Sequence, residues 1–200
     1  MMKKPLSLLI FSLVISYGYS QSLTGKSNVL KNMPSSLNTA QIPEFSSSDD
    51  ARKLIKDIMD VVGLTPDFII KAANVPNVQA EIRHHKRYII YNPGFIKMMN
   101  TMSKDKWTSV FILAHEIGHH LDGHTILKGS RPPQIELEAD EFSGFVLNKL
   151  GATLEQSKLA LSYIAKPEAS KTHPGRGDRI EAVEIGWNKG QANNSTVIKF

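Results

Sequence analysis

The segment that most constrains this chain is His115-Glu116-Ile117-Gly118-His119, which places two histidines four residues apart with a glutamate between them. On an α-helix, residues four apart lie about 40° apart around the axis and ~6 Å apart along it. His115 and His119 can therefore present two imidazole rings to one metal ion, with Glu116 beside them. This is the logic of the H-E-x-x-H zinc peptidase motif, in which zinc lowers the pKa of its water to about 7 and the glutamate takes the proton.

A helix at this position is predicted independently of the motif. Apolar residues recur at intervals of three and four residues along Trp107, Val110, Phe111, Ala114, Ile117 and Leu121. This spacing indicates a helix with one face in a core. We expect Ser103 to be the N-cap and Gly123 to be the stop. The motif therefore falls in the last two turns of the predicted helix.

A second acidic segment, Glu136-Leu137-Glu138-Ala139-Asp140, opens another run with helical apolar spacing. Glu136 and Asp140 are four residues apart and share a helix face. Glu136 can complete a His₂Glu site that leaves one coordination position open, as catalytic zinc requires. Asp140 can accept the second ring N–H of a ligand histidine and so fix its tautomer. The predicted ligands of one Zn²⁺ per chain are His115, His119 and Glu136, with Glu116 as general base.

Other interpretations of these letters stay open. Glu138 is an alternative third ligand, but it lies ~200° around the helix from Glu136. We prefer Glu136 because only that choice leaves a carboxylate, Asp140, on the same face. His120 and His124 are then surplus, and we expect each to be a surface histidine or to contact a metal ligand. For the whole site, the alternative is a chance match, since so short a motif also arises at random.

Three motifs together resemble the gluzincin peptidases of the HtpX and CAAX prenyl protease (Oma-like) group. They are HEIGHH at 115–120, ELEAD at 136–140, and the H-P-x-x-x-x-R-I pattern that starts at His173. The chain matches all three in order, over roughly residues 74–187. The resemblance implies a zincin-like fold and peptide hydrolysis, with the same zinc ligands and base as above and with Asp140 as partner of a ligand histidine.

The resemblance also places His173 and Arg179 near the catalytic cleft. It implies that His173 donates a hydrogen bond to the oxyanion of the tetrahedral intermediate. Stabilisation of this type typically raises the reaction rate by ~10²–10³-fold. From the residues alone, His173-Pro174 is only the start of a helix. The best-known members of the group span the membrane several times, and this chain has no such spans. Soluble exported members are the closer comparison.

The first 20 residues predict a secretory signal peptide. Lys3 and Lys4 precede an apolar stretch at 6–15, and Gly18-Tyr19-Ser20 supplies small residues before a cut ahead of Gln21. The apolar stretch is too short to span a bilayer, and no later run approaches about eighteen residues. We therefore expect an exported protein of the bacterial periplasm or the extracellular space. A retained anchor is the alternative.

Composition favours one globular domain whose fold does not depend on disulfides, since the chain has no cysteine. The net charge is +5, and the basic residues are scattered apart from Arg83-His84-His85-Lys86-Arg87. Without a long basic stripe, nucleic-acid binding is not expected. We expect polypeptide substrates as partners, and the sequence carries no signal for an oligomeric state.

Turn-forming residues and the spacing of apolar residues divide the chain into further segments. Residues 21–47 are expected to be a flexible linker, 48–187 the zincin-like peptidase domain, and 188–200 a tail that frays. Strands are expected at 68–70, 77–82 and 87–91, and helices at 51–62, 95–101, 135–150, 154–165 and 178–187. This order suits an α+β fold with a small sheet followed by the active-site helix and further helices.

One strand is expected to line the cleft. An exposed edge at Lys86–Tyr91 could pair with the backbone of an extended substrate. The alternation of its residues fits an internal strand equally well.

The function that these features predict is a zinc-dependent endopeptidase, with a role in protein quality control of the cell envelope. One alternative is a zinc-bound chaperone or peptide-binding module that does not hydrolyse its ligand. Another is an interaction domain with a fortuitous motif. Glu116 favours hydrolysis over the first alternative, because purely structural zinc sites are usually closed by four protein ligands.

Overall fold

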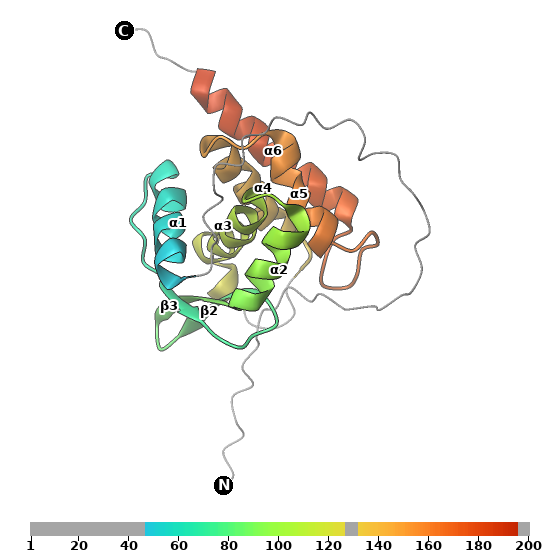
Figure 1. The fold of residues 1–200 in the computed structure, drawn as a ribbon. Helices are drawn as coiled ribbons and strands as arrows, with labels where there is room; N and C mark the ends of the chain where they lie inside the picture. The colour runs from blue at the N-terminus through green and yellow to red at the C-terminus, as the bar shows by residue number, and fades with distance from the viewer. Residues whose placement is uncertain (1–46, 127–131, 196–200) are drawn as a thin grey trace, which may run out of the picture.

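The computed structural model describes residues 47–126 and 132–195, and its architecture is α+β (Figure 1). The signal peptide expected at 1–20 and nearly all of the linker expected at 21–47 lie outside the described residues. The helices are α1 (Ser48–Val61), α2 (Pro93–Ser103), α3 (Trp107–Leu121), the short 3-10 helix η2 (His124–Ile126), α4 (Gln134–Lys149), α5 (Leu154–Ile164) and α6 (Arg176–Ser195). The strands are β1 (Ile69–Ala72), β2 (Val78–Arg83) and β3 (Lys86–Tyr91).

The three strands form one small sheet in the order β1-β3-β2. β2 and β3 are antiparallel and pair Ala80 with Ile89, whereas β1 runs parallel to β3. His84 and His85 make the turn between β2 and β3, with left-handed φ angles of 49° and 61°. Two consecutive left-handed residues match the twist of the strands, as in type I′ hairpins. The basic cluster of the sequence is thus a tight hairpin turn.

The expectation that Lys86–Tyr91 is an exposed edge is wrong. β3 pairs with a strand on each side, so β1 and β2 are the edges of the described sheet. Ile89, Ile90 and Tyr91 are buried and form a continuous apolar run, which is typical of a strand covered on both faces. The alternative of an internal strand is the correct one.

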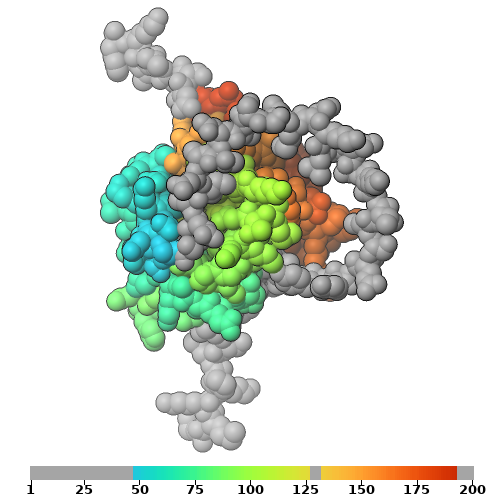
Figure 2. All heavy atoms as spheres, in the orientation of Figure 1, coloured from blue at the N-terminus to red at the C-terminus, as the bar shows by residue number. Residues whose placement is uncertain are grey.

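α3 is the central helix of the domain, and every residue from Trp107 to His120 is buried. The apolar spacing predicted only one buried face. α4, α5 and β2 all pack against α3, which lies in the middle of Figure 1. In the face shown in Figure 2, α1, the strands and α2 (blue to green) form much of the visible surface. The polar side chains of α3 are therefore removed from water and need protein partners or a ligand.

The ends of α3 match the sequence only in part. The N-cap expected at Ser103 is wrong, because α2 runs through Ser103 and α3 begins at Trp107. The backbone N–H of Trp107 donates instead to the side chain of Asp105, at 2.8 Å. The stop at Gly123 is as expected, with a φ of 74° that favours glycine. That turn leads the chain directly into η2.

α4 and α6 approach each other closely through two glycines. A Cβ at Gly144 would lie 2.1 Å from the carbonyl oxygen of Val183, and one at Gly186 would lie 1.8 Å from that of Glu141. Such distances exclude any side chain, so the two backbones meet directly. This contact fixes the position of the rest of α6, including Arg179, relative to α4.

The last helix is longer than the sequence predicted. α6 continues past Trp187 to Ser195, so residues 188–195 are helical rather than part of a frayed tail at 188–200. Among the described helices, none is both long enough and apolar enough to cross a membrane.

Candidate metal centre

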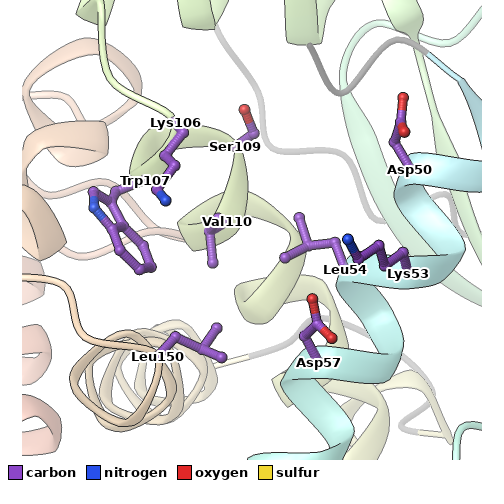
Figure 3. Close-up of a pocket in the computed structure, with 9 residues that line it drawn as sticks. All are labelled: Asp50, Lys53, Leu54, Asp57, Lys106, Trp107, Ser109, Val110 and Leu150. Atoms are coloured by element: carbon purple, nitrogen blue, oxygen red, sulfur yellow. The ribbon is translucent and has the colours of Figure 1, made fainter. Parts of the chain in front are cut away.

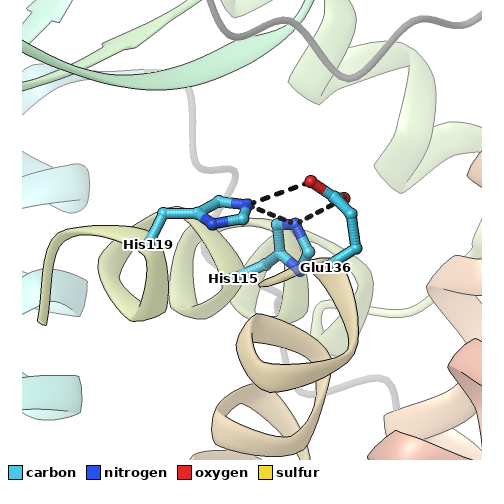
Figure 4. Close-up of side chains that lie close together, drawn as sticks. All are labelled: His115, His119 and Glu136. Atoms are coloured by element: carbon cyan, nitrogen blue, oxygen red, sulfur yellow. Dashed lines mark hydrogen bonds and ion pairs between the residues drawn. The ribbon is translucent and has the colours of Figure 1, made fainter. Parts of the chain in front are cut away.

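Three buried side chains from α3 and α4 converge on one point. His115 and His119 project from the same face of α3, and Glu136 projects from the first turn of α4 toward both rings (Figure 4). One ligand atom from each residue lies within 4.8 Å of the others, so the group could hold a metal ion. The helical spacing explains the two rings, whereas the meeting with Glu136 depends on how α3 and α4 cross.

The distances within this group fit a tetrahedral ion. The Nε2 atoms of His115 and His119 lie 3.1 Å apart, and each is 3.5 Å from an oxygen of Glu136. With ligand bonds of about 2.1 Å at tetrahedral angles, ligand atoms would lie ~3.4 Å apart. Both carboxylate oxygens of Glu136 are buried without a hydrogen-bond partner. Burying a carboxylate without hydrogen bonds is costly, and a cation among these three residues would compensate its charge directly.

A buried ion pair between Asp140 and Arg179 supports the ring of His115. Its Nδ1 lies 2.9 Å from Oδ1 of Asp140, and the guanidinium of Arg179 donates to both oxygens of Asp140. Burial alone would raise the pKa of Asp140, but the charge of Arg179 and its hydrogen bonds hold that pKa below its usual range. Asp140 is therefore an ionised acceptor, and it fixes the ring of His115 with Nε2 toward the other ligands.

The charges of the group are strongly coupled. Burial lowers the pKa of His115, but Asp140 and Glu136 outweigh it and raise that pKa to about 9. Burial raises the pKa of Glu136, but His115, His119 and Arg179 together lower it to about 2. Before a metal binds, the pair is therefore a protonated ring beside an ionised carboxylate.

The ring of His119 has a different support, which confirms one of the two alternatives given for His124, contact with a candidate metal ligand. Its Nδ1 lies 3.0 Å from Nδ1 of His124, and Nε2 of His124 lies 2.8 Å from Oε2 of Glu138. His124 is buried and reaches His119 because η2 turns back after Gly123. Glu138, the rival third ligand, thus faces His124 and not the group of three. The contact of His124 with Glu138 is the part of this support that the sequence did not predict.

Glu116 lies beside the metal ligands, against the edge of the sheet. Its Oε2 accepts a 2.7 Å hydrogen bond from the backbone N–H of Ala80 in β2. The side chain is buried, and burial raises its pKa to about 8, with the charge of His115 acting in the opposite direction. A carboxylate whose pKa lies near neutral pH is well suited to take up and return a proton.

His173 and Arg179 lie together at a cavity of about 230 Å³ formed before and at the start of α6. His173 is half-buried, and its Nδ1 lies 2.9 Å from the hydroxyl oxygen of Thr172. Its Nε2 is buried with no hydrogen-bond partner. Burial lowers the pKa of His173, although the negative charge of Glu136 opposes this. One nitrogen of the ring, Nε2, is thus without a hydrogen bond.

The side chain of His120 is buried, and its polar contacts run to β3 and to Thr125 rather than to a ring of the candidate metal centre. Its ring stacks on Phe68 with 5.3 Å between centroids, and its Nε2 lies 2.9 Å from the carbonyl oxygen of Tyr88. His120 therefore ties α3 to the central strand. Burial lowers the pKa of its ring to about 4.

A second cavity, of about 280 Å³, lies between α1, the start of α3 and the end of α4 (Figure 3). Its walls include the apolar side chains of Leu54, Trp107, Val110 and Leu150. The lining of the cavity also includes Lys53, Lys106 and acidic residues of α1. No histidine lines it, so it offers none of the ring ligands that the metal group combines.

Comparisons with known proteins leave this site to be judged on its own geometry. No model of a known protein family, no characterised protein and no solved structure matches the chain. The resemblance to gluzincin peptidases therefore rests on the three sequence motifs alone.

Proposed function

We propose that this chain is a zinc-dependent endopeptidase of the gluzincin type. The observation that carries the proposal is the convergence of His115, His119 and Glu136 on one point, with Glu116 beside them. Two imidazoles and one carboxylate are the ligand set of catalytic rather than structural zinc. When bound, zinc would polarise a peptide carbonyl and activate a water for attack. The signal-like N-terminus supports action on polypeptides in the bacterial cell envelope or outside the cell.

Glu116 is the proposed general base. Its carboxylate would accept the proton of the attacking water and return it to the leaving amine. The hydrogen bond from Ala80 holds one oxygen, Oε2, and leaves Oε1 for the water. Arg179 and Asp140 would act indirectly, by holding His115 in its ligand orientation. The unpaired Nε2 of His173 is the proposed donor to the developing oxyanion.

The substrate backbone is proposed to lie along β2 rather than β3. β2 is an edge of the described sheet, and its Ala80 already contacts Glu116. A peptide added to this edge would have its scissile bond next to the general base. Main-chain hydrogen bonds along an edge strand bind peptides of many sequences, which suits an enzyme with unfolded polypeptides as substrates.

Replacing Glu116 by Gln tests the proposal. The variant should bind zinc stoichiometrically and lose casein hydrolysis, because the amide cannot accept the proton. Glu155→Gln is the matched control, since that side chain is 85% exposed on α5 and should leave hydrolysis unchanged. Zinc content is measured by elemental analysis and hydrolysis with and without chelator. Undiminished cleavage by Glu116→Gln would refute the mechanism.

The same assay addresses the main alternative. If the parent protein binds zinc and unfolded casein but leaves the casein intact, the chain is a binding or chaperone module and not a peptidase. If the parent takes up no zinc, the metal centre itself is wrong.

A further inference from the structure

His124 uses both of its ring nitrogens inside the protein. Nδ1 faces Nδ1 of His119 at 3.0 Å, and Nε2 faces the Glu138 carboxylate at 2.8 Å. His119 and His124 are buried, whereas the side chain of Glu138 is 48% exposed. A chain of hydrogen bonds therefore runs from Glu138 on the surface of α4, through His124 of η2, to His119 on α3, which is one of the three candidate metal ligands.

The proton positions in this chain follow from chemistry. An ionised carboxylate only accepts, so Nε2 of a neutral His124 ring must carry its proton toward Glu138. The other nitrogen, Nδ1, is then an acceptor. His119 must donate to it from its own Nδ1, which leaves the lone pair of His119 on Nε2. That nitrogen is the one directed at His115 and Glu136.

We propose that Glu138, acting through His124, is a positioning residue that selects the metal-binding tautomer of His119. The inference rests on the metal centre of the proposed function but not on peptide hydrolysis. It assigns a role to two residues that the catalytic mechanism leaves unused. It also explains why α4 carries carboxylates on two of its faces, with Asp140 serving His115 and Glu138 serving His119.

The support of His115 ends inside the protein, whereas the support of His119 ends at the surface. Asp140 is buried against Arg179, so the support of His115 is closed inside the protein. Glu138 lies at a surface cavity that it shares with Asp122, Glu141, Phe142, Phe145 and Lys189. The tautomer of His119 can therefore be changed by a surface substitution that leaves the core packing intact. This makes the inference testable without unfolding the protein.

Glu138→Gln is the test variant. A glutamine amide can present either its oxygen or its N–H to His124, so the variant no longer dictates the direction of the hydrogen bonds. Zinc affinity, measured by competition with a chelator, should fall by about 10–100-fold, the usual effect of losing an outer partner of a ligand histidine. In the zinc-free protein, ¹⁵N NMR of His119 should change from the Nδ1–H tautomer to a mixture of both tautomers.

Glu141→Gln is the matched control. It removes the same charge from the same helix, but among the described residues the carboxylate of Glu141 pairs with Lys189 and not with a histidine. It should retain parental zinc affinity and the parental His119 spectrum. An equal loss of affinity in both variants would assign the effect to surface charge and overturn the inference. An unchanged tautomer in Glu138→Gln would overturn it as well.

These outcomes are independent of catalysis. If the parent binds zinc but cleaves no peptide, the proposed function fails while the tautomer assignment stands. If Glu138→Gln matches the parent in affinity and spectrum, the tautomer assignment fails, whatever the hydrolytic activity.

Discussion

Arg179 holds Asp140 with two hydrogen bonds, from Nε to Oδ2 at 2.6 Å and from Nη2 to Oδ1 at 2.8 Å. The same Oδ1 lies 2.9 Å from Nδ1 of His115. Both partners of the ion pair are buried, so neither charge is compensated by water. One carboxylate therefore neutralises a guanidinium and also orients a ring of the candidate metal centre.

Asp140→Asn should damage both tasks. We expect zinc affinity to fall by about 10–100-fold, because His115 loses its ionised partner. The free energy of unfolding of the zinc-free protein should fall by about 3–5 kcal/mol, because Arg179 becomes an unpaired buried charge. Chelator competition and denaturant unfolding measure the two effects.

The double variant Asp140→Asn/Arg179→Met separates these tasks. Removing the orphaned charge should restore part of the stability without restoring zinc affinity. Strictly additive losses of stability in the two single variants and the double variant would contradict the coupling, since residues in contact should show an interaction energy.

Gly144→Ala and Gly186→Ala should each destabilise the protein, although alanine is the better helix former by about 1 kcal/mol. The added Cβ would overlap the backbone of the opposite helix, at 2.1 Å and 1.8 Å. Overpacking of this kind costs about 1–3 kcal/mol or more. Gly186→Ala should also weaken zinc binding, because moving α6 moves Arg179 away from Asp140. Thermal melts and chelator competition test both effects.

Gly177→Ala is the matched control for these helix glycines. Gly177 lies in the first turn of α6, and beyond its own helical turn no atom of the described residues lies within 4 Å of a Cβ built there. This variant should be as stable as the parent or more stable. If all three alanine variants melt at the parental temperature, the close backbone contact does not govern the packing of α6.

Zinc binding should release protons. Burial lowers the pKa of His115, but Asp140 and Glu136 raise it to about 9, so the ring of the zinc-free protein is protonated at pH 6. A histidine ligand must be neutral, so at least one proton leaves on binding. Glu136, with a pKa of about 2, is already ionised and releases none. Apparent affinity should therefore rise with pH up to about 9.

Calorimetry checks this by titrating zinc in buffers that differ in ionisation enthalpy. The measured heat should change with the buffer, and the slope should be smaller in Asp140→Asn, which lacks the charge that raises the His115 pKa. Heats that are the same in every buffer would contradict a protonated ring.

His120 should make the zinc-free protein sensitive to acid. Burial lowers the pKa of His120 to about 4, while an unfolded histidine titrates near 6.5. As the pH falls below about 6.5, His120 binds a proton in the unfolded chain but stays neutral in the folded protein. The contribution of His120 to the free energy of unfolding therefore falls. At higher pH both states are neutral and the effect vanishes.

His120→Gln tests this linkage, because glutamine can still donate to the Tyr88 carbonyl but does not titrate. In urea unfolding at pH 7, 5.5 and 4.5, the stability of the parent relative to the variant should fall as the pH falls. Glu116 and His115, whose pKa values are raised to about 8 and about 9, act with the opposite sign but contribute equally to both proteins, so the difference between the two curves isolates His120. Parallel curves would show that the folded protein protonates His120 as readily as the unfolded chain.

Local geometry explains the parts of this molecule that its sequence predicted. His115 and His119 share a face because a helix turns by a fixed angle per residue, and Glu136 and Asp140 share a face for the same reason. Apolar spacing predicted α1, α3, α4 and α5 because each residue's environment repeats within one element. The end of α3 next to Gly123 could be predicted because glycine readily adopts the left-handed conformation that terminates a helix, a property of the residue itself.

Apart from the N-cap at Ser103, which is a local error, the wrong or missing assignments concern elements that are distant in sequence. The central position of β3, the direction of Glu138 toward His124, the bond from Ala80 to Glu116 and the length of α6 depend on which surfaces meet. Motif resemblance placed Arg179 near the site, but its pairing with Asp140 follows from the close contact of α4 and α6 at Gly144 and Gly186. Sequence by itself thus determined which side chains share a helix face. Only the tertiary structure decided which of those faces pack against one another. Packing depends on pairs of elements, and the spacing of residues within one element does not encode it.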